Sequence, residues 1–138
     1  MSELVRFGVS MDERLLKALD DLVEHRGYAN RSEAIRDLVR AEQVRDAWEG
    51  GNDEVVGTLT LVYDHHVREL NERLVNLQHE HHDLVHSTMH VHLSHRSCLE
   101  VIVLHGKAER VRVLSDRLIA ARGVKHGQLV ATTGTDLV

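Results

Sequence analysis

The chain has 138 residues, enough for one ordinary domain or two small ones. Its formal net charge of −5 argues against a broadly basic surface. No apolar run approaches the roughly 20 residues that a membrane helix needs. The N-terminus lacks the basic flank and apolar stretch of a signal peptide, and Cys98 is the only cysteine, so no intrachain disulfide is possible. We therefore expect a cytoplasmic protein.

The first fifty residues predict one strand followed by two helices. Residues 5–10 alternate apolar and polar or small side chains, which is the period of a strand. Apolar residues between 15 and 23 then recur at helical spacing, after Asp12 and before Gly27. Asn30, with Glu33 three residues later, predicts a capping box at the start of a second helix.

One strand and two helices do not make a sheet alone, but two copies can pair their strands into an antiparallel ribbon. Arg6, Gly8 and Ser10 would then lie on the outer face of a ribbon that fits the DNA major groove. The free N–H groups near Arg31 and Ser32 would hold a phosphate at the start of the second helix. The pattern alone equally allows a dimerisation element without DNA, since the first 48 residues carry eight basic and ten acidic residues.

A polar, glycine-rich stretch at residues 49–54 predicts a linker between a domain of residues 1–48 and a domain of residues 55–138. The second domain reads in the order βαββαβ, which predicts an α+β, ferredoxin-like fold with helices on one face of an antiparallel sheet. Its expected elements are strand 55–63, helix 66–78, strands 84–93 and 98–104, helix 108–118 and strand 127–133.

Twelve histidines are unusual for this length, and seven of them lie between residues 79 and 95. The simpler interpretation of these histidines is a solvated polar stretch. The alternative is metal binding, because His90 and His92 share one face of a predicted strand and Cys98 opens the strand that returns. A thiolate with two imidazoles suits nickel, copper or zinc, and ligand type alone does not separate these metals. A fourth ligand would come from the end of the preceding helix, with His79, His81 and His82 as candidates.

Several stretches resemble the NikR family of nickel-responsive regulators. They are residues 77–84, 90–100 and 122–127, together with 26–37, which also resembles ribbon-helix-helix repressors. The resemblance implies a dimeric ribbon-helix-helix domain joined to an ACT-like metal-binding domain. It also implies square-planar Ni²⁺ bound by His90, His92 and Cys98 of one subunit and His79 of a second, across the interface of a homotetramer built as a dimer of dimers.

The same resemblance implies a nickel-dependent repressor of nickel-uptake genes that binds palindromic operator DNA and is not an enzyme. It places Arg6, Gly8 and Ser10 at base-reading positions. It implies DNA-backbone contacts for Arg36 and Arg68 and a potassium-like cation at Glu33 and Asp37, although spacing alone favours a solvated acidic pair at these two positions. Glu100 is a candidate for orienting a metal ligand.

Four other functions compete with this hypothesis. A regulator of copper, cobalt or zinc would use the same ligands, and a metal-buffering protein would leave the N-terminal strand and helices without a purpose. A zinc hydrolase would need an open water position, with Glu100 as general base, but no hydrolase motif is present. A ribbon-helix-helix repressor that senses an amino acid would leave His90, His92 and Cys98 without a role.

Overall fold

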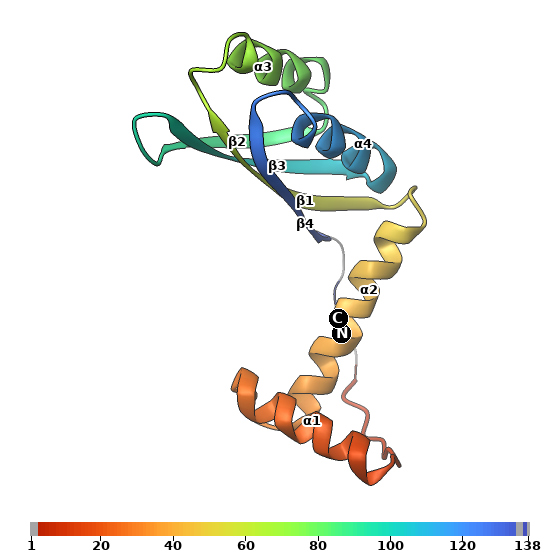
Figure 1. The fold of residues 1–138 in the computed structure, drawn as a ribbon. Helices are drawn as coiled ribbons and strands as arrows, with labels where there is room; N and C mark the ends of the chain where they lie inside the picture. The colour runs from red at the N-terminus through yellow and green to blue at the C-terminus, as the bar shows by residue number, and fades with distance from the viewer. Residues whose placement is uncertain (1–2, 135–136, 138) are drawn as a thin grey trace. The chain divides into compact units, whose positions relative to one another are not determined.

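The computed structural model describes residues 3–134 and 137, and the chain forms two compact units, residues 1–41 and 42–138. In the first unit, helix α1 (Glu13–Arg26) is followed by the first part of α2 (Arg31–Glu49) (Figure 1). The predicted stop is confirmed, since Gly27 ends α1 in the left-handed conformation with φ 73°. At the start of the helix, the side chain of Asp12 accepts a hydrogen bond from Arg14 N at 2.8 Å and so acts as the N-cap.

The capping box at the start of α2 also forms as expected. The side-chain oxygen of Asn30 accepts from Glu33 N at 2.9 Å, and the Glu33 carboxylate accepts from Ala29 N at 3.2 Å. These bonds satisfy backbone donors that have no partner within the first turn of the helix.

The strand expected at residues 5–10 does not form in the single chain, where residues 3–12 adopt neither helix nor strand. Val5, Phe7 and Val9 are 76%, 74% and 56% exposed. A strand needs a hydrogen-bonded neighbour, and the first unit supplies none to this segment. The apolar side chains on every second residue therefore stay largely exposed in one chain.

The second unit is an α+β sandwich with the expected βαββαβ order. Its sheet is antiparallel with strand order β2-β3-β1-β4, and α3 and α4 pack together on one face (Figure 1). The elements are β1 (Glu54–Asp64), α3 (Leu70–Glu80), β2 (Val85–His92), β3 (Ser97–Lys107), α4 (Ala108–Ile119) and β4 (Val124–Thr132).

Two predicted element starts differ from the structure by more than one residue. Helix α3 begins at Leu70 and not at residue 66, because Asp64 accepts from His66 N through its side chain and from Val67 N through its carbonyl, which closes a turn first. Strand β4 begins at Val124 and not at Gly127. Gly127 lies inside the strand. A Cβ there would meet Ile119 at 2.6 Å, so the glycine permits close approach of α4.

The core lies between the sheet and the two helices. Leu59, Leu61 and Ile102 from the sheet and Leu114 and Leu118 from α4 are fully buried. Because side chains alternate along a strand, the residues between these point to the opposite face of the sheet, which neither helix covers. None of the described helices combines the length and apolar character needed to cross a membrane.

Helix α2 continues beyond the predicted domain boundary at residue 48 and into the second unit. Trp48 is 7% exposed, and its indole N–H donates to the carbonyl of Thr132 at 2.8 Å. The Trp48 carbonyl accepts from Arg112. The last turn of α2 thus packs with the C-terminal core, and the linker that remains after the helix is shorter than residues 49–54. The domain limits drawn from the sequence stay predictions.

Replacing Leu59 by Ala tests this core. We expect the free energy of unfolding of the metal-free protein to fall by about 2–5 kcal/mol, because the change leaves a cavity at a position with no exposed surface. Val113→Ala, at a position 48% exposed on α4, should change it by less than about 1 kcal/mol. Chemical denaturation of both variants measures the difference, and equal effects would contradict the assigned core.

Candidate metal centre

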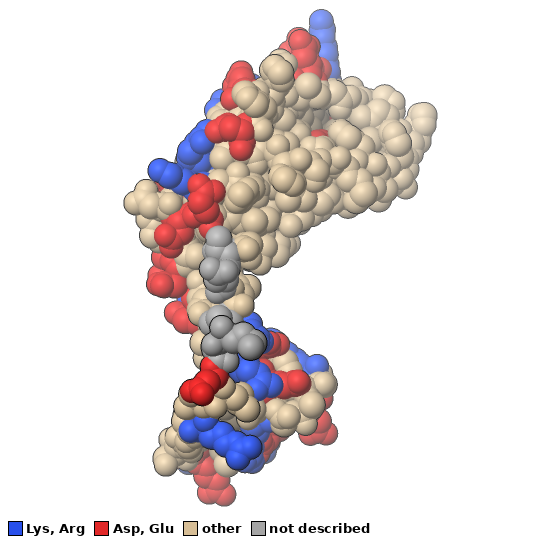
Figure 2. Space-filling view, turned by 180° about the vertical axis from the view of Figure 1, so that it is seen from behind, with Lys and Arg blue, Asp and Glu red and all other residues tan. Residues whose placement is uncertain are grey.

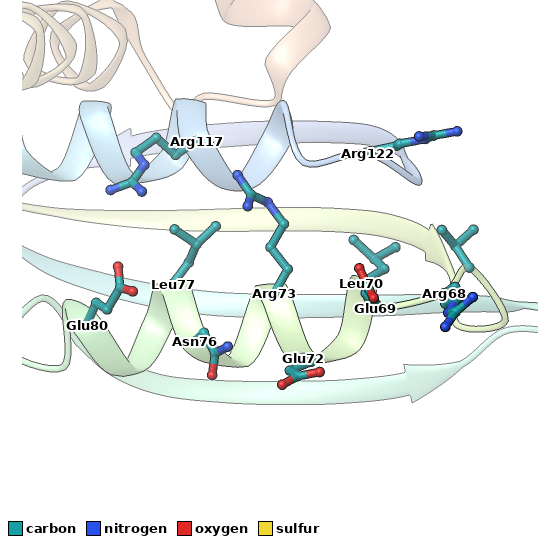
Figure 3. Close-up of a pocket in the computed structure, with 11 residues that line it drawn as sticks. Arg68, Glu69, Leu70, Glu72, Arg73, Asn76, Leu77, Glu80, Arg117 and Arg122 are labelled. Atoms are coloured by element: carbon teal, nitrogen blue, oxygen red, sulfur yellow. The ribbon is translucent and has the colours of Figure 1, made fainter.

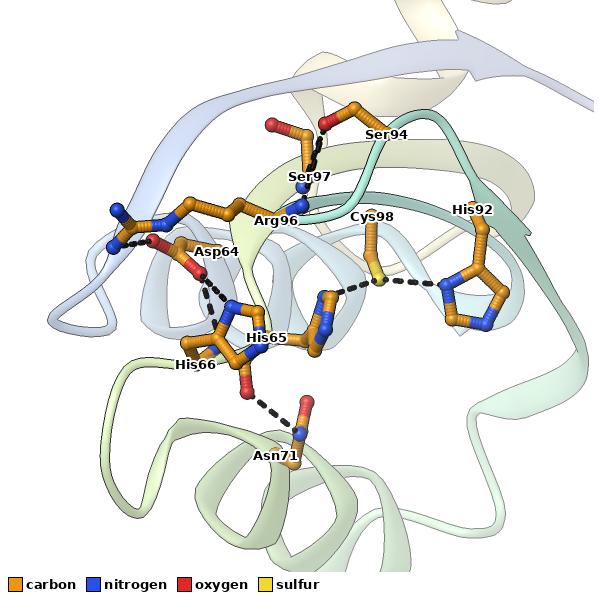
Figure 4. A network of polar contacts seen from close by, with 9 residues as sticks. All are labelled: Asp64, His65, His66, Asn71, His92, Ser94, Arg96, Ser97 and Cys98. Carbon is orange, nitrogen blue, oxygen red and sulfur yellow. Dashed lines mark hydrogen bonds and ion pairs between the residues drawn. The ribbon is translucent and has the colours of Figure 1, made fainter.

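Three neighbouring strands bring the candidate metal ligands to one end of the sheet. His92 ends β2 and pairs directly with Cys98 at the start of β3, while Tyr63 near the end of β1 pairs with Cys98 from the other side. His65 follows β1 immediately. The antiparallel register therefore places His65 and His92 on either side of Cys98 (Figure 4).

The ligand atoms of these three residues lie close enough to share one metal ion. Cys98 Sγ is 3.3 Å from His65 Nδ1 and 3.5 Å from His92 Nδ1, and the three ligand atoms lie within 4.8 Å of one another. Cys98 is buried, His65 is half-buried and His92 is exposed. The site is thus anchored on a buried sulfur and opens toward the surface through His92.

The turn that carries His65 is held by Asp64. The Asp64 carboxylate accepts from His66 N at 2.9 Å and lies 3.0 Å from Arg96 Nη2, while His65 N donates to the Arg96 carbonyl at 3.2 Å (Figure 4). The backbone N–H of His66, followed by the Arg96 guanidinium, lowers the pKa of Asp64 against the effect of burial. Asp64 therefore stays charged and fixes the position of His65 beside the thiol.

His90 lines the same cavity but contacts different partners. This cavity, of about 310 Å³, is lined by His65, His90, His92 and Cys98 together with Tyr63, Glu100 and residues of α3. His90 Nε2 lies 3.7 Å from Glu100 Oε1, and its Nδ1 lies 3.4 Å from the Tyr63 hydroxyl. His90 is therefore next to the cluster of His65, His92 and Cys98 but is directed to a carboxylate and a phenol.

Glu100 is 1% exposed and connects the sheet to α3. Its carboxylate accepts from Gln78 Nε2 at 2.8 Å and from the Tyr63 hydroxyl at 3.4 Å, while Thr88 donates to the Gln78 side-chain oxygen at 3.1 Å. Burial, and then the Glu100 charge, raises the pKa of Tyr63 to about 12, so the phenol stays a donor. These bonds tie the end of α3 to the strand residue opposite His90.

His79 lies in the last turn of α3 and is exposed. Its ring stands 6.4 Å from that of His82, and it belongs to no ligand group in the described part of this chain. The three ligands predicted on the strands line one cavity, whereas the fourth does not reach it within the same chain.

His65 is the residue of the cluster that sequence reasoning left out of the metal site. Spacing gives little signal for it, because it is 33 residues from Cys98. The information lies in the strand register, which places Tyr63 opposite Cys98 and so brings the residues just after β1 to the same end of the sheet. A thiolate and imidazoles are donors for nickel, copper and zinc, so the chemistry of the cavity fits the expected class of metal.

Two family models match the chain in adjacent segments. Residues 56–132 match the NikR C-terminal nickel-binding domain, and residues 5–45 match the ribbon-helix-helix proteins of the CopG family. The chain belongs to the NikR family. It therefore combines a ribbon-helix-helix DNA-binding domain with a nickel-binding domain. The family consists of transcription regulators and is not an enzyme family.

Curated relatives agree along almost the whole chain. Proteins named as nickel-responsive regulators are 59% identical in Geobacter sulfurreducens, over 96% of each chain, and 53% identical in Pelobacter propionicus, over 99% of each chain. An uncharacterized protein of Thermotoga maritima has a solved structure that covers 57% of this chain and 98% of its own, with a TM-score of 0.52 at 16% identity. That likeness concerns the fold alone.

The residues expected at the DNA interface lie mainly on the surface. Arg6, Gly8 and Ser10 are exposed in the N-terminal segment, and Ser32 and Arg36 are exposed in the first turns of α2. Arg31 pairs with Asp20 through two bonds of 2.8 and 3.0 Å. A phosphate that binds this guanidinium would therefore have to share its N–H groups with the Asp20 carboxylate or displace that carboxylate. Arg68 is exposed before α3.

The two carboxylates expected to hold a secondary cation have other partners. Glu33 belongs to the capping box, and Asp37 pairs with Arg40 at 2.9 Å. Neither belongs to a group of three or more potential metal ligands within the described residues. The potassium-like site at Glu33 and Asp37 stays a prediction.

The buried carboxylate makes Gln78 testable. Gln78→Ala removes the donor 2.8 Å from Glu100, and we expect the free energy of unfolding to fall by about 1–3 kcal/mol because a buried charge loses a hydrogen bond. Gln128→Ala, at an exposed position on β4, is the control. Thermal and chemical unfolding of the metal-free protein measure both, and a Gln78→Ala variant as stable as the control would contradict this role.

Proposed function

We propose that the protein is a nickel-dependent DNA-binding repressor of nickel-uptake genes. Membership of the NikR family supports nickel-responsive regulation, and the observation that carries the site is the shared cavity of His90, His92 and Cys98. The repressor activity, the target genes and the assembly described below are parts of this proposal.

The proposed nickel ligands are His90, His92 and Cys98 of one subunit and His79 of a second. A mixed thiolate and imidazole set suits Ni²⁺, and a square-planar arrangement is typical of this ion. His90 would turn from Glu100 toward the ion, and Glu100 would then orient it from behind. His65 competes for the same cavity, so a set that contains His65 in place of His90 is the alternative within one chain.

Two surfaces support self-association. The apolar side chains of Val5, Phe7 and Val9 need a second copy to form the ribbon. The uncovered face of the sheet carries Met89 and Val130, each 57% exposed, and lies in a broad region that lacks charged side chains (Figure 2). An apolar face of this kind is suited to contact with another protein. We propose that both surfaces are used and that the protein is a tetramer, a dimer of dimers.

Metal binding would act through α3. This helix carries His79 at its end, and Gln78 beside it bonds to Glu100, which faces His90. An ion shared by His79 of one subunit and the strand ligands of another stabilises the assembly in which α3 holds that position. The ion shifts the equilibrium only by its preference for that arrangement. The paired ribbons would then be spaced to match two operator half-sites.

Substitution of Cys98 tests whether this site controls DNA binding. We expect nickel to strengthen operator binding by the unaltered protein and to have no effect on Cys98→Ala, because the sulfur is the centre of the proposed ligand set. His95→Ala is the matched control, since His95 is an exposed histidine of the same turn outside the ligand cluster. Gel-shift titrations with and without nickel measure the response. A Cys98→Ala protein that keeps its nickel response would overturn the proposal.

Mixed assemblies test whether one site draws ligands from two subunits. His79→Ala keeps the strand ligands, whereas Cys98→Ala keeps His79, so neither variant alone builds a complete site. Co-expressed in one cell, the two would form mixed tetramers in which some sites recover all four ligands. We expect the square-planar nickel absorption to return only in the mixture. Its return in pure His79→Ala protein would show that His79 is not a ligand and would favour a site completed within one chain.

A further inference from the structure

A cavity of about 920 Å³ lies between α3 and α4 (Figure 3), and its lining does not include His65, His90, His92 or Cys98. It is lined by residues of α3 and the segment before it, with Arg117 from α4 and Arg122 just after that helix. Its volume is within the range of small-molecule sites, which run from about 300 to about 1,000 Å³.

The arginines between residues 54 and 134 fall into two groups, those with an ion pair and those without one. Arg96, Arg110 and Arg112 each form an ion pair, with Asp64, Asp83 and Glu109 respectively. The remaining arginines between residues 54 and 134 form no ion pair within the described chain, and all of them line the cavity: Arg68, Arg73, Arg117 and Arg122. Unpaired guanidiniums therefore gather in one place.

Two of these side chains come from opposite walls of the cavity. Arg73 extends from α3 toward α4, and Arg117 extends from α4 toward α3, whereas Glu72 points away from α4 (Figure 3). Positive charges on opposite walls of one cavity attract an anion placed between them. Their planar N–H forks match the oxygens of phosphate, which guanidinium binds with two parallel hydrogen bonds.

The carboxylates of the cavity limit the size of that anion. Glu69 precedes α3 and Glu80 is its last residue, so a negative charge lies at each end of the helix that forms one wall. A long phosphodiester chain laid along the groove would meet both carboxylates. We propose that the groove between α3 and α4 binds a compact phosphate-type oxyanion, held by Arg73 and Arg117.

Pyrophosphate is the probe, titrated calorimetrically into the metal-free, full-length protein because pyrophosphate chelates nickel. We expect saturable binding that weakens as salt is raised. The Arg73→Gln/Arg117→Gln double variant should bind at least about tenfold more weakly, since both hydrogen-bonding forks are lost. Arg110→Gln removes the same charge from α4 outside the cavity and should bind as the unaltered protein does. Circular dichroism and nickel titration verify that each variant is folded.

Two results would overturn the proposal. One is the absence of pyrophosphate binding to the unaltered protein, or equal binding by the double variant. The other is a loss that appears only with duplex DNA, measured by the same variants in gel shifts, because the arginines would then contact backbone phosphates and not a compact anion. This proposal does not depend on the nickel site, so its failure leaves the proposed repressor function intact.

Discussion

The pairing of His92 with Cys98 across the β2–β3 hairpin is the constraint on which the metal centre depends. Residues directly opposite each other in an antiparallel pair point to the same face, so this register places the imidazole and the thiol together. The tight turn that follows β2 fixes the register through the bonds from Leu93 N and Ser94 N to the Ser97 carbonyl, at 2.9 and 3.2 Å. A slip of one residue would turn His90 and His92 to the opposite face and dismantle the cavity.

The same pairing explains why a carboxylate is tolerated in the core. Glu100 stands opposite His90, two residues further from the turn than Cys98 and on the same face of the sheet. A buried charge is costly unless hydrogen bonds compensate for it, and here Gln78 and Tyr63 supply them. Because Gln78 precedes His79, the residue that stabilises the buried charge is also the neighbour of the proposed ligand from α3.

Much of the fold was predictable because it follows from local pattern. The caps at Gly27 and Asn30, the strands of the second unit and the βαββαβ order all rest on spacing within a few residues, and the order led to the correct α+β class. Placing His90, His92 and Cys98 around one cavity needed only the alternation of side chains along two strands that a short turn connects.

What was missed depends on contacts between distant segments. The position of His65 beside Cys98 follows from the pairing of β1 with β3, which spacing along the chain does not encode. The delayed start of α3 depends on the bonds that Asp64 makes with His66 and Val67. Residues 5–10 have the alternating pattern of a strand but gain no hydrogen-bonded strand partner within the described part of one chain, so the pattern did not predict their structure here.

Cys98 is the chain's only thiol, which has a consequence for redox chemistry. Oxidation of this sulfur would give a sulfenic acid that has no second cysteine in the same chain to trap it as a disulfide. Repair would then rely on thiols supplied by other molecules, and further oxidation to the sulfinic acid would be permanent. Burial of the sulfur, 5% exposed, and its coordination of an ion would therefore protect the chain from oxidants.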